Sequence, residues 1–271
     1  LGQLALGRGA CYGRAAIDAT SEDTEVAATV PCALFGALFA QSVVQCAVAR
    51  ARPAKGRVAE AAAWPCAGVQ ALTLLYYVVE RSDAACLLTA PPFLSHVSGV
   101  TARPLHLVLW TCSVSAQVLA IYSVERELSA RMPRPPPTNA RRDCCAALVA
   151  VQVMCWCSAL LDARAPGATS YGLALAALSC AAFYALLAKG VRGPLARGAA
   201  AARRGKDERI AAQLERAAVF FTVAWHGFPL VWGAGVLGVV GDARVRLGYV
   251  LCDVVAKFLP ASIYVSLAVD P

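Results

Sequence analysis

Seven long apolar runs, separated by polar segments, dominate the hydropathy pattern of this chain. They cover about residues 28–49, 59–79, 105–126, 144–162, 170–188, 215–240 and 247–269. Each run approaches the roughly 20 residues that a helix needs to cross a bilayer. The pattern therefore predicts an all-α membrane protein, a seven-transmembrane-helix bundle formed by residues 28–271. The more polar residues 1–27 predict an extracellular amino-terminal segment.

The composition supports a membrane location and excludes an ordinary soluble domain. Hydrophobic residues make up 59% of the chain and charged residues only 15%, whereas soluble domains contain about 25% charged residues. Most of the 12 cysteines lie inside the apolar runs, where they act as small hydrophobic residues. Cys11 and Cys86 fall in segments expected on the outer side, so the sequence leaves undecided whether either of them forms a disulfide bridge.

The basic residues orient the predicted bundle. Most of the 25 lysines and arginines lie in three connections, at 50–57, 126–142 and 189–216. Because Lys and Arg accumulate in cytoplasmic loops, the amino terminus is predicted outside and the carboxyl terminus inside. Residues 81–103 are interrupted by Pro and Gly and are interpreted as an outer loop. Contact with anionic lipid explains the net charge of +8, so we expect no nucleic-acid partner. We also expect no enzymatic activity.

The last apolar run carries an aspartate and a lysine near its middle. Asp253 and Lys257 are four residues apart and share one helical face. A lone charge at this depth costs about 3 kcal/mol, so the pair predicts a functional site rather than simple packing. A buried lysine amine can condense with an aldehyde, and the iminium that results requires a carboxylate partner in a site of low dielectric constant.

The sixth run presents an aromatic face toward one side. Trp225, Phe228, Pro229 and Trp232 fall at positions i, i+3, i+4 and i+7 of a helix. Such a face can line a slot for a flat, elongated apolar ligand, although an aromatic stripe alone is more often plain helix packing. The lysine and aspartate on the following run favour the ligand interpretation.

Together these two motifs resemble those of the microbial (type 1) rhodopsins. Residues 253–257 match the Asp-x-x-x-Lys signature of that family, and residues 225–232 match its Trp-x-x-x-Pro-x-x-Trp pattern. The amino-acid sequence of these two motifs is similar to that of algal channelrhodopsins of the pump-like type. The resemblance implies all-trans-retinal bound covalently to Lys257 as a protonated Schiff base, with Asp253 as counterion and the aromatic face beside the polyene. It also implies a homo-oligomer, dimer or trimer, and we expect the plasma membrane as its location.

The third run departs from the family pattern, which places Arg-x-x-Asp/Glu-Trp there. Alignment on Arg103 puts His106 at the position of the proton acceptor, and alignment on Trp110 puts Leu109 there. A third alignment, on residues 111–112, puts Leu107 there. No Asp or Glu occurs between residues 83 and 125, so none of the three supplies a carboxylate, and outward proton pumping is disfavoured.

The resemblance also implies roles for residues of this third run, which would pass beside the chromophore. Trp110, Thr111 and Cys112 would contact the retinal. Arg103 and His106 are candidates for an acceptor or gate, since a histidine titrates near neutrality; packing is the competing explanation for His106. With Asp253 as the single available carboxylate, we predict absorption at longer wavelength than in relatives with two carboxylates.

The polar residues inside the first three runs are mostly neutral. The candidates for pore lining are Gln41, Gln45, Gln70, Thr73, Ser113 and Gln117. Neutral hydrogen-bonding groups with basic mouths favour conduction of small inorganic anions such as chloride, although glutamines can equally form bonds between helices. The sequence thus predicts a light-gated anion channel. The alternatives are a sensory photoreceptor with a cytoplasmic effector beyond residue 271, a cation channel, or an unusual pump that uses His106.

Overall fold

The computed structural model describes residues 32–37, 39–41, 43–44, 47, 56–81, 104–132, 139–162, 169–236, 239–240, 244–245 and 247–257. The predicted extracellular segment 1–27 and the residues Cys11 and Cys86 lie outside this part of the chain. Arg103 and Gln45 also lie outside it, and the side chain of His106 is not described.

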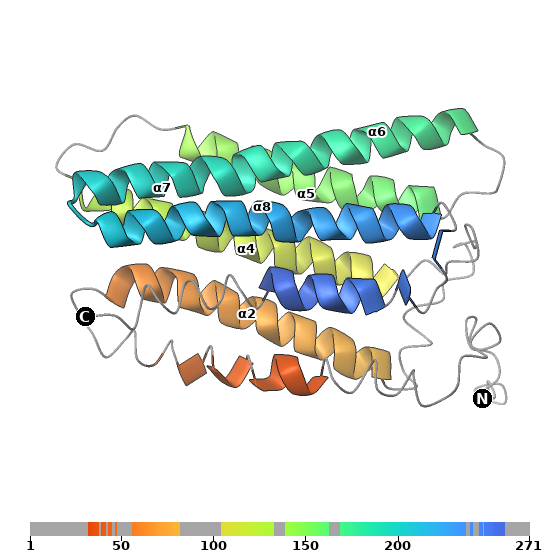
Figure 1. Cartoon of the computed structure of the whole chain (residues 1–271), viewed down its shortest axis with the longest axis horizontal. Helices are drawn as coiled ribbons and strands as arrows, with labels where there is room; N and C mark the ends of the chain where they lie inside the picture. Colours follow the sequence, from red (N-terminus) through yellow and green to blue (C-terminus); the bar gives the residue numbers. More distant parts are fainter. Residues whose placement is uncertain are drawn as a thin grey trace, which may run out of the picture.

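The described residues form a bundle of long helices that run side by side (Figure 1). The labelled elements are α2 (Gly56–Arg81), α4 (Pro104–Ala130), α5 (Ala140–Asp162), α6 (Thr169–Leu186), η1 (Leu187–Arg192), α7 (Gly193–Arg204) and α8 (Glu208–Val236). Helical residues within 32–47 and the helix 247–257 complete the bundle. Because α6, η1 and α7 continue one another without a break, the described residues form seven helical rods, which confirms the predicted seven-helix bundle.

The fifth rod is longer than its apolar run. The run ends near residue 188, whereas the helix continues through η1 and α7 to Arg204. Alanine and arginine, which dominate residues 195–204, have high helix propensity and explain the continuation. Leu195 and Ala199 on α7 are buried in the same core cluster as Leu128 of α4 and Leu214 of α8. The extension is therefore held by packing as well as by propensity.

Close packing around η1 depends on a glycine. A Cβ atom at Gly190 would lie 3.1 Å from Val118 Cγ2 of α4 and 3.2 Å from Ala147 Cβ of α5. Both neighbours belong to the main core cluster. Glycine at this position therefore lets the π-helical turn approach α4 and α5 more closely than a larger residue would permit.

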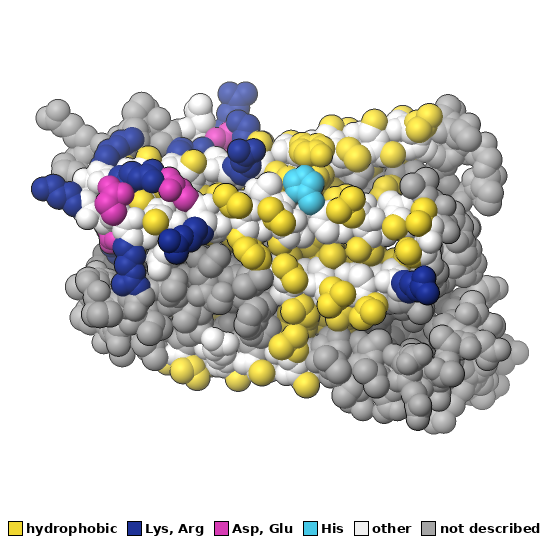
Figure 2. Space-filling model, viewed as in Figure 1, with side chains coloured by type: hydrophobic (Ala, Val, Ile, Leu, Met, Phe, Trp, Pro, Cys, Tyr) yellow, Lys and Arg dark blue, Asp and Glu magenta, His cyan; other side chains and the backbone are white. Residues whose placement is uncertain are grey.

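The face formed by α6 and α8 is apolar, whereas charged side chains gather at one end of the bundle (Figure 2). Leu173 and Tyr184 of α6 and Val223 and Leu230 of α8 are among the exposed large hydrophobic side chains of these two helices. By length and composition, Gly172–Arg204 and Glu208–Ala234 could cross a membrane. The charged end coincides with α7 and the beginning of α8.

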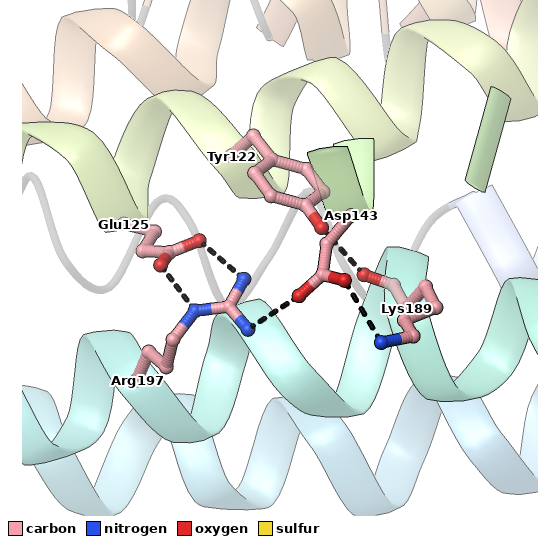
Figure 3. A network of polar contacts seen from close by, with 5 residues as sticks. All are labelled: Tyr122, Glu125, Asp143, Lys189 and Arg197. Carbon is pink, nitrogen blue, oxygen red and sulfur yellow. Dashed lines mark hydrogen bonds and ion pairs between the residues drawn. The ribbon is translucent and has the colours of Figure 1, made fainter. Parts of the chain in front are cut away.

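An ion-pair network joins three rods near this charged end (Figure 3). Arg197 of α7 donates hydrogen bonds to Glu125 of α4, with Nη2–Oε2 at 3.1 Å, and to Asp143 of α5, with Nη1–Oδ2 at 3.2 Å. Lys189 of η1 donates to Asp143 Oδ1 at 2.8 Å, and this bond lowers the pKa of the Asp143 carboxyl. The Tyr122 hydroxyl donates to the Lys189 carbonyl at 2.7 Å. The network ties α4 and α5 to the π-helical turn and its extension.

Candidate functional site

A buried ion pair forms the centre of the candidate site. Lys257 Nζ lies 2.6 Å from Asp253 Oδ1, one helical turn away on helix 247–257. The lysine side chain is 3% exposed and the aspartate side chain is fully buried. A lysine amine in this setting is shielded from water and has a carboxylate in contact, which is the arrangement that a charged imine on the same nitrogen would require.

Tyr77 of α2 is a member of the site that the sequence analysis missed. Its hydroxyl donates to Asp253 Oδ2 at 3.0 Å, and its ring stacks on Phe35 with centroids 5.6 Å apart. The aspartate thus uses one oxygen for Tyr77 and the other for Lys257. The sequence contained a pattern that could have indicated Tyr77, because Gln70, Thr73 and Tyr77 fall at i, i+3 and i+7 and therefore share one helical face.

The contacts of Trp110 place α4 relative to the other helices. The Trp110 ring meets the ring of Phe228 on α8 at 5.0 Å and that of Tyr249 on helix 247–257 at 5.1 Å, both edge to face. The preceding residue, Leu109, is buried in the same cluster as Phe35 and Tyr77. A leucine therefore packs where the alignment on Trp110 puts the proton acceptor. Among the described side chains, no second carboxylate contacts Lys257.

The aromatic face of α8 lies partly inside the bundle. Trp225 is buried in the core cluster that also contains Ala256, the neighbour of Lys257. Phe228, Pro229 and Trp232 are half-buried.

Two glycines allow α8 and helix 247–257 to approach each other closely. A Cβ at Gly227 of α8 would lie 2.8 Å from Cys252 Sγ on helix 247–257. A Cβ at Gly248 of that helix would lie 2.9 Å from Val231 Cγ2 of α8. Helix α8 and the lysine-bearing helix are therefore direct neighbours.

The predicted polar residues divide into buried and exposed groups. Gln70, Thr73, Ser113 and Gln117 are buried. Thr111 is half-buried, whereas Gln41 and Cys112 are exposed, and the structure does not bring these two residues to the Lys257 pair.

Two buried glutamines contact the backbone of the lysine-bearing helix. Gln70 Nε2 donates to the Lys257 carbonyl at 2.9 Å. Gln117 Nε2 donates to the Ala256 carbonyl at 3.4 Å. In this structure both glutamines bond between helices, which is the alternative to pore lining that the sequence left open.

The residues of this site fit a covalently bound retinal. A shielded amine with a carboxylate in contact suits a protonated Schiff base, and the neighbouring indole and phenyl rings suit a polyene. Lys257 would hold the group, and Trp110, Trp225, Phe228 and Trp232 would flank it.

The sequence matches no protein-family model and no curated protein. The fold, in contrast, matches solved microbial rhodopsins. The light-driven proton pump CsR of Coccomyxa subellipsoidea aligns with a TM-score of 0.67 at 17% identity, over 90% of this chain and 96% of that one. Bromide-bound halorhodopsin of Halobacterium salinarum aligns with a TM-score of 0.66 at 20% identity, over 90% and 93%. The red light-activated channelrhodopsin Chrimson aligns with 0.58 at 14% identity, over 96% and 83%.

These similarities confirm the resemblance at the level of the fold: the chain has the microbial rhodopsin fold. The similar structures include a proton pump, a halorhodopsin and a channel. The shared fold is thus compatible with pumping and with conduction, and the choice between them depends on the residues at the site.

Proposed function

We propose that this chain is an integral membrane protein that binds all-trans-retinal on Lys257 and acts as a light-gated channel for small anions such as chloride. The observation that carries the proposal is the buried contact of Lys257 with Asp253, without a second carboxylate in contact among the described side chains and with Leu109 packed in the cluster of Tyr77. We further propose that the protein lies in the plasma membrane as a dimer or trimer, with its amino terminus outside.

The residues around Lys257 have distinct tasks in this proposal. Bound retinal would supply the light-driven isomerisation. Asp253 would neutralise the positive charge on the lysine nitrogen, and the hydrogen bond from Tyr77 would hold the carboxylate in orientation. Trp110 and Phe228, in edge-to-face contact, would pack beside the bound retinal and shield it from water.

The surroundings of the pair favour conduction over outward proton pumping. Such a pump needs an acceptor for the proton that leaves the lysine nitrogen, and Leu109 cannot accept one. Among the described side chains of α2 and α4, the buried polar ones other than Glu125 and the tyrosines are neutral amides and hydroxyls, such as Gln70 and Ser113. Neutral hydrogen-bonding groups that line a pore, together with basic residues at its mouths, favour conduction of anions over cations. The path we propose follows the first, second, third and seventh rods.

Photocurrents test this function directly. In cells that express the protein with added retinal, a current that reverses at the chloride equilibrium potential is expected, and it should follow a change of chloride on either side. A reversal potential that follows sodium or protons would contradict anion selectivity. A Lys257→Ala variant that still gave a coloured, light-responsive protein would contradict the assignment of the chromophore.

A sensory photoreceptor is the second candidate function. It is favoured by the helical extension that α7 and the beginning of α8 form beyond the apolar run, because a signalling partner could contact it. A pigment that forms and cycles in light without carrying any current would favour this candidate.

A further inference from the structure

One carbonyl of the lysine-bearing helix cannot receive the usual α-helical hydrogen bond, because the residue four positions later is a proline. In an α-helix the carbonyl of residue i accepts a hydrogen bond from the N–H of residue i+4. Four residues after Ala256 the sequence has Pro260, and proline has no N–H. The Ala256 carbonyl therefore cannot receive that bond and is open to a side-chain donor, and a buried carbonyl that stays unpaired is costly.

Gln117 and Gln70 provide side-chain donors at this point. Gln117 of α4 donates to the Ala256 carbonyl at 3.4 Å, and Gln70 of α2 donates to the adjacent Lys257 carbonyl at 2.9 Å. Both side chains are buried. The two amides thus attach α2 and α4 to successive carbonyls, one of which belongs to the residue that we propose to carry retinal.

The same face of α2 contacts helix 247–257 at a second point. Tyr77 bonds to the Asp253 carboxylate, and Gln70, two helical turns away on α2, bonds to the backbone of Lys257. Thr73, between them, instead donates to its own helix at the Val69 carbonyl. A movement at Lys257 would therefore act on α2 at Gln70, while Tyr77 remains with the aspartate.

Two buried oxygen atoms near the glutamine amides could accept further hydrogen bonds. Gln70 Oε1 and Ser113 Oγ are buried and have no hydrogen-bond partner among the described residues. Buried groups of this kind are commonly satisfied by ordered water. Water at this point could also replace the glutamine amides at the two carbonyls, so that the interhelical bonds could open without leaving the carbonyls unpaired.

We propose that Gln70 and Gln117 form a glutamine latch that closes the route between α2, α4 and helix 247–257 in the dark, and that a displacement of Lys257 opens it. The latch positions the lysine-bearing backbone and does not touch the reacting nitrogen. This inference rests on the proposed attachment of retinal to Lys257. It goes beyond that proposal by assigning the closed state to two particular side chains.

Substitution by methionine tests the latch, because methionine nearly preserves the length of glutamine but cannot donate a hydrogen bond. Gln70→Met and Gln117→Met are compared with Gln152→Met, a control at an exposed position of α5. The first measurement is the rate at which hydroxylamine bleaches the retinal-loaded protein in the dark, which reports access of water to the Schiff base. Each latch variant should bleach about fivefold faster than the parent, the factor that corresponds to one net hydrogen bond, and the control should be unchanged.

The second measurement is the closing rate of the photocurrent, which should fall in both latch variants. Bleaching and closing rates within a factor of about two of the parent, well below the effect of one net hydrogen bond, would overturn the latch. Loss of pigment in both variants, with the control intact, would show a purely structural role and would also overturn it.

The outcomes separate the latch from the proposed function. A parent that forms pigment but carries no current contradicts the channel, while the bleaching rates still decide the latch. A parent that forms no pigment overturns both. Fast bleaching confined to one of the two variants would overturn a latch made of both residues.

Discussion

At the scale of single residues, the site depends on how Asp253 is shared. One oxygen accepts a hydrogen bond from Tyr77 at 3.0 Å and the other lies 2.6 Å from Lys257 Nζ, and the Asp253 side chain is fully buried. The spacing of Asp253 and Lys257 predicted their contact, because local helix geometry alone brings residues four apart together. The same spacing could not predict Tyr77, which lies 176 residues away in the chain.

Removal of the carboxylate should change the pH dependence of the colour. In Asp253→Asn, a buried positive charge would lack its partner, and such a charge is strongly disfavoured. We expect visible absorbance to be lost at neutral pH and recovered on acidification, as an absorbance titration would measure. Asp207→Asn, at the turn before α8, is the matched control and should keep the colour of the parent. An Asp253→Asn protein that titrates like the parent would contradict the counterion role.

Addition of a carboxylate should test the alignment of α4. Leu109 packs in the same cluster as Tyr77, so Leu109→Asp would place a second negative charge close to the ion pair. A second counterion should stabilise the protonated ground state and shift the absorption maximum to shorter wavelength, which a spectrum of the purified pigment measures. Leu107→Asp is the comparison, because another alignment puts residue 107 at this position. A larger shift from Leu107→Asp would contradict the alignment on Trp110.

At the scale of elements, the network around Arg197 determines how α4, α5 and the fifth rod meet. The sequence analysis used its charged members, among them Lys189 and Arg197, only to orient the bundle. It could not pair them, because charge patterning along a chain does not specify which helices become neighbours. The structure puts Glu125 opposite Arg197 with two hydrogen bonds, a geometry that adds strength and directionality.

Loss of this pair should lower the stability of the bundle. Glu125→Gln would break a contact in which the glutamate side chain is 3% exposed and the arginine side chain 29%. We expect a loss of about 2 kcal/mol, less than the 3–5 kcal/mol of a fully buried pair, because the arginine keeps contact with water. Thermal or denaturant unfolding of the pigment measures this loss.

Glu127→Gln is the matched control for this prediction. Glu127 pairs with Arg126 at 3.6 Å on the same helix, where the arginine is largely exposed. Exposed pairs contribute about 0–1 kcal/mol. Equal losses in the two variants would show that the network adds nothing beyond a surface ion pair.

At the scale of the whole molecule, the bundle has the microbial rhodopsin fold, and its charged end contrasts with its apolar face. The orientation of the bundle in the membrane, with the amino terminus outside, remains a prediction from the distribution of Lys and Arg. If the carboxyl-terminal side is inside, the connection between α7 and α8 lies in the cytoplasm. This connection contains exposed Lys206, which has a φ of 62°.

Limited proteolysis should determine that orientation. Trypsin is expected to cut between α7 and α8 in sealed inside-out vesicles, and to leave this connection intact in right-side-out vesicles. The sizes of the two fragments identify the cut. Permeabilised vesicles serve as the control, since both preparations should then be cleaved. Cleavage confined to right-side-out vesicles would reverse the predicted topology.

The sequence by itself determined the seven helices and the motifs at residues 225–232 and 253–257. These features follow from hydropathy and helical periodicity, which are properties of neighbouring residues. It also showed that no Asp or Glu lies between residues 83 and 125, so none of the three alignments of the third run supplies a carboxylate at the acceptor position.

Only the tertiary structure decided which side chains meet across the bundle. It brought Tyr77 to Asp253, Trp110 to Phe228, and Gln70 to the carbonyl of Lys257. Each of these contacts joins helices that are far apart in the chain, and it depends on the rotation and depth of both helices. Hydropathy specifies neither quantity, because many rotations bury the same apolar surface, whereas a hydrogen bond of about 3 Å is compatible with few of them.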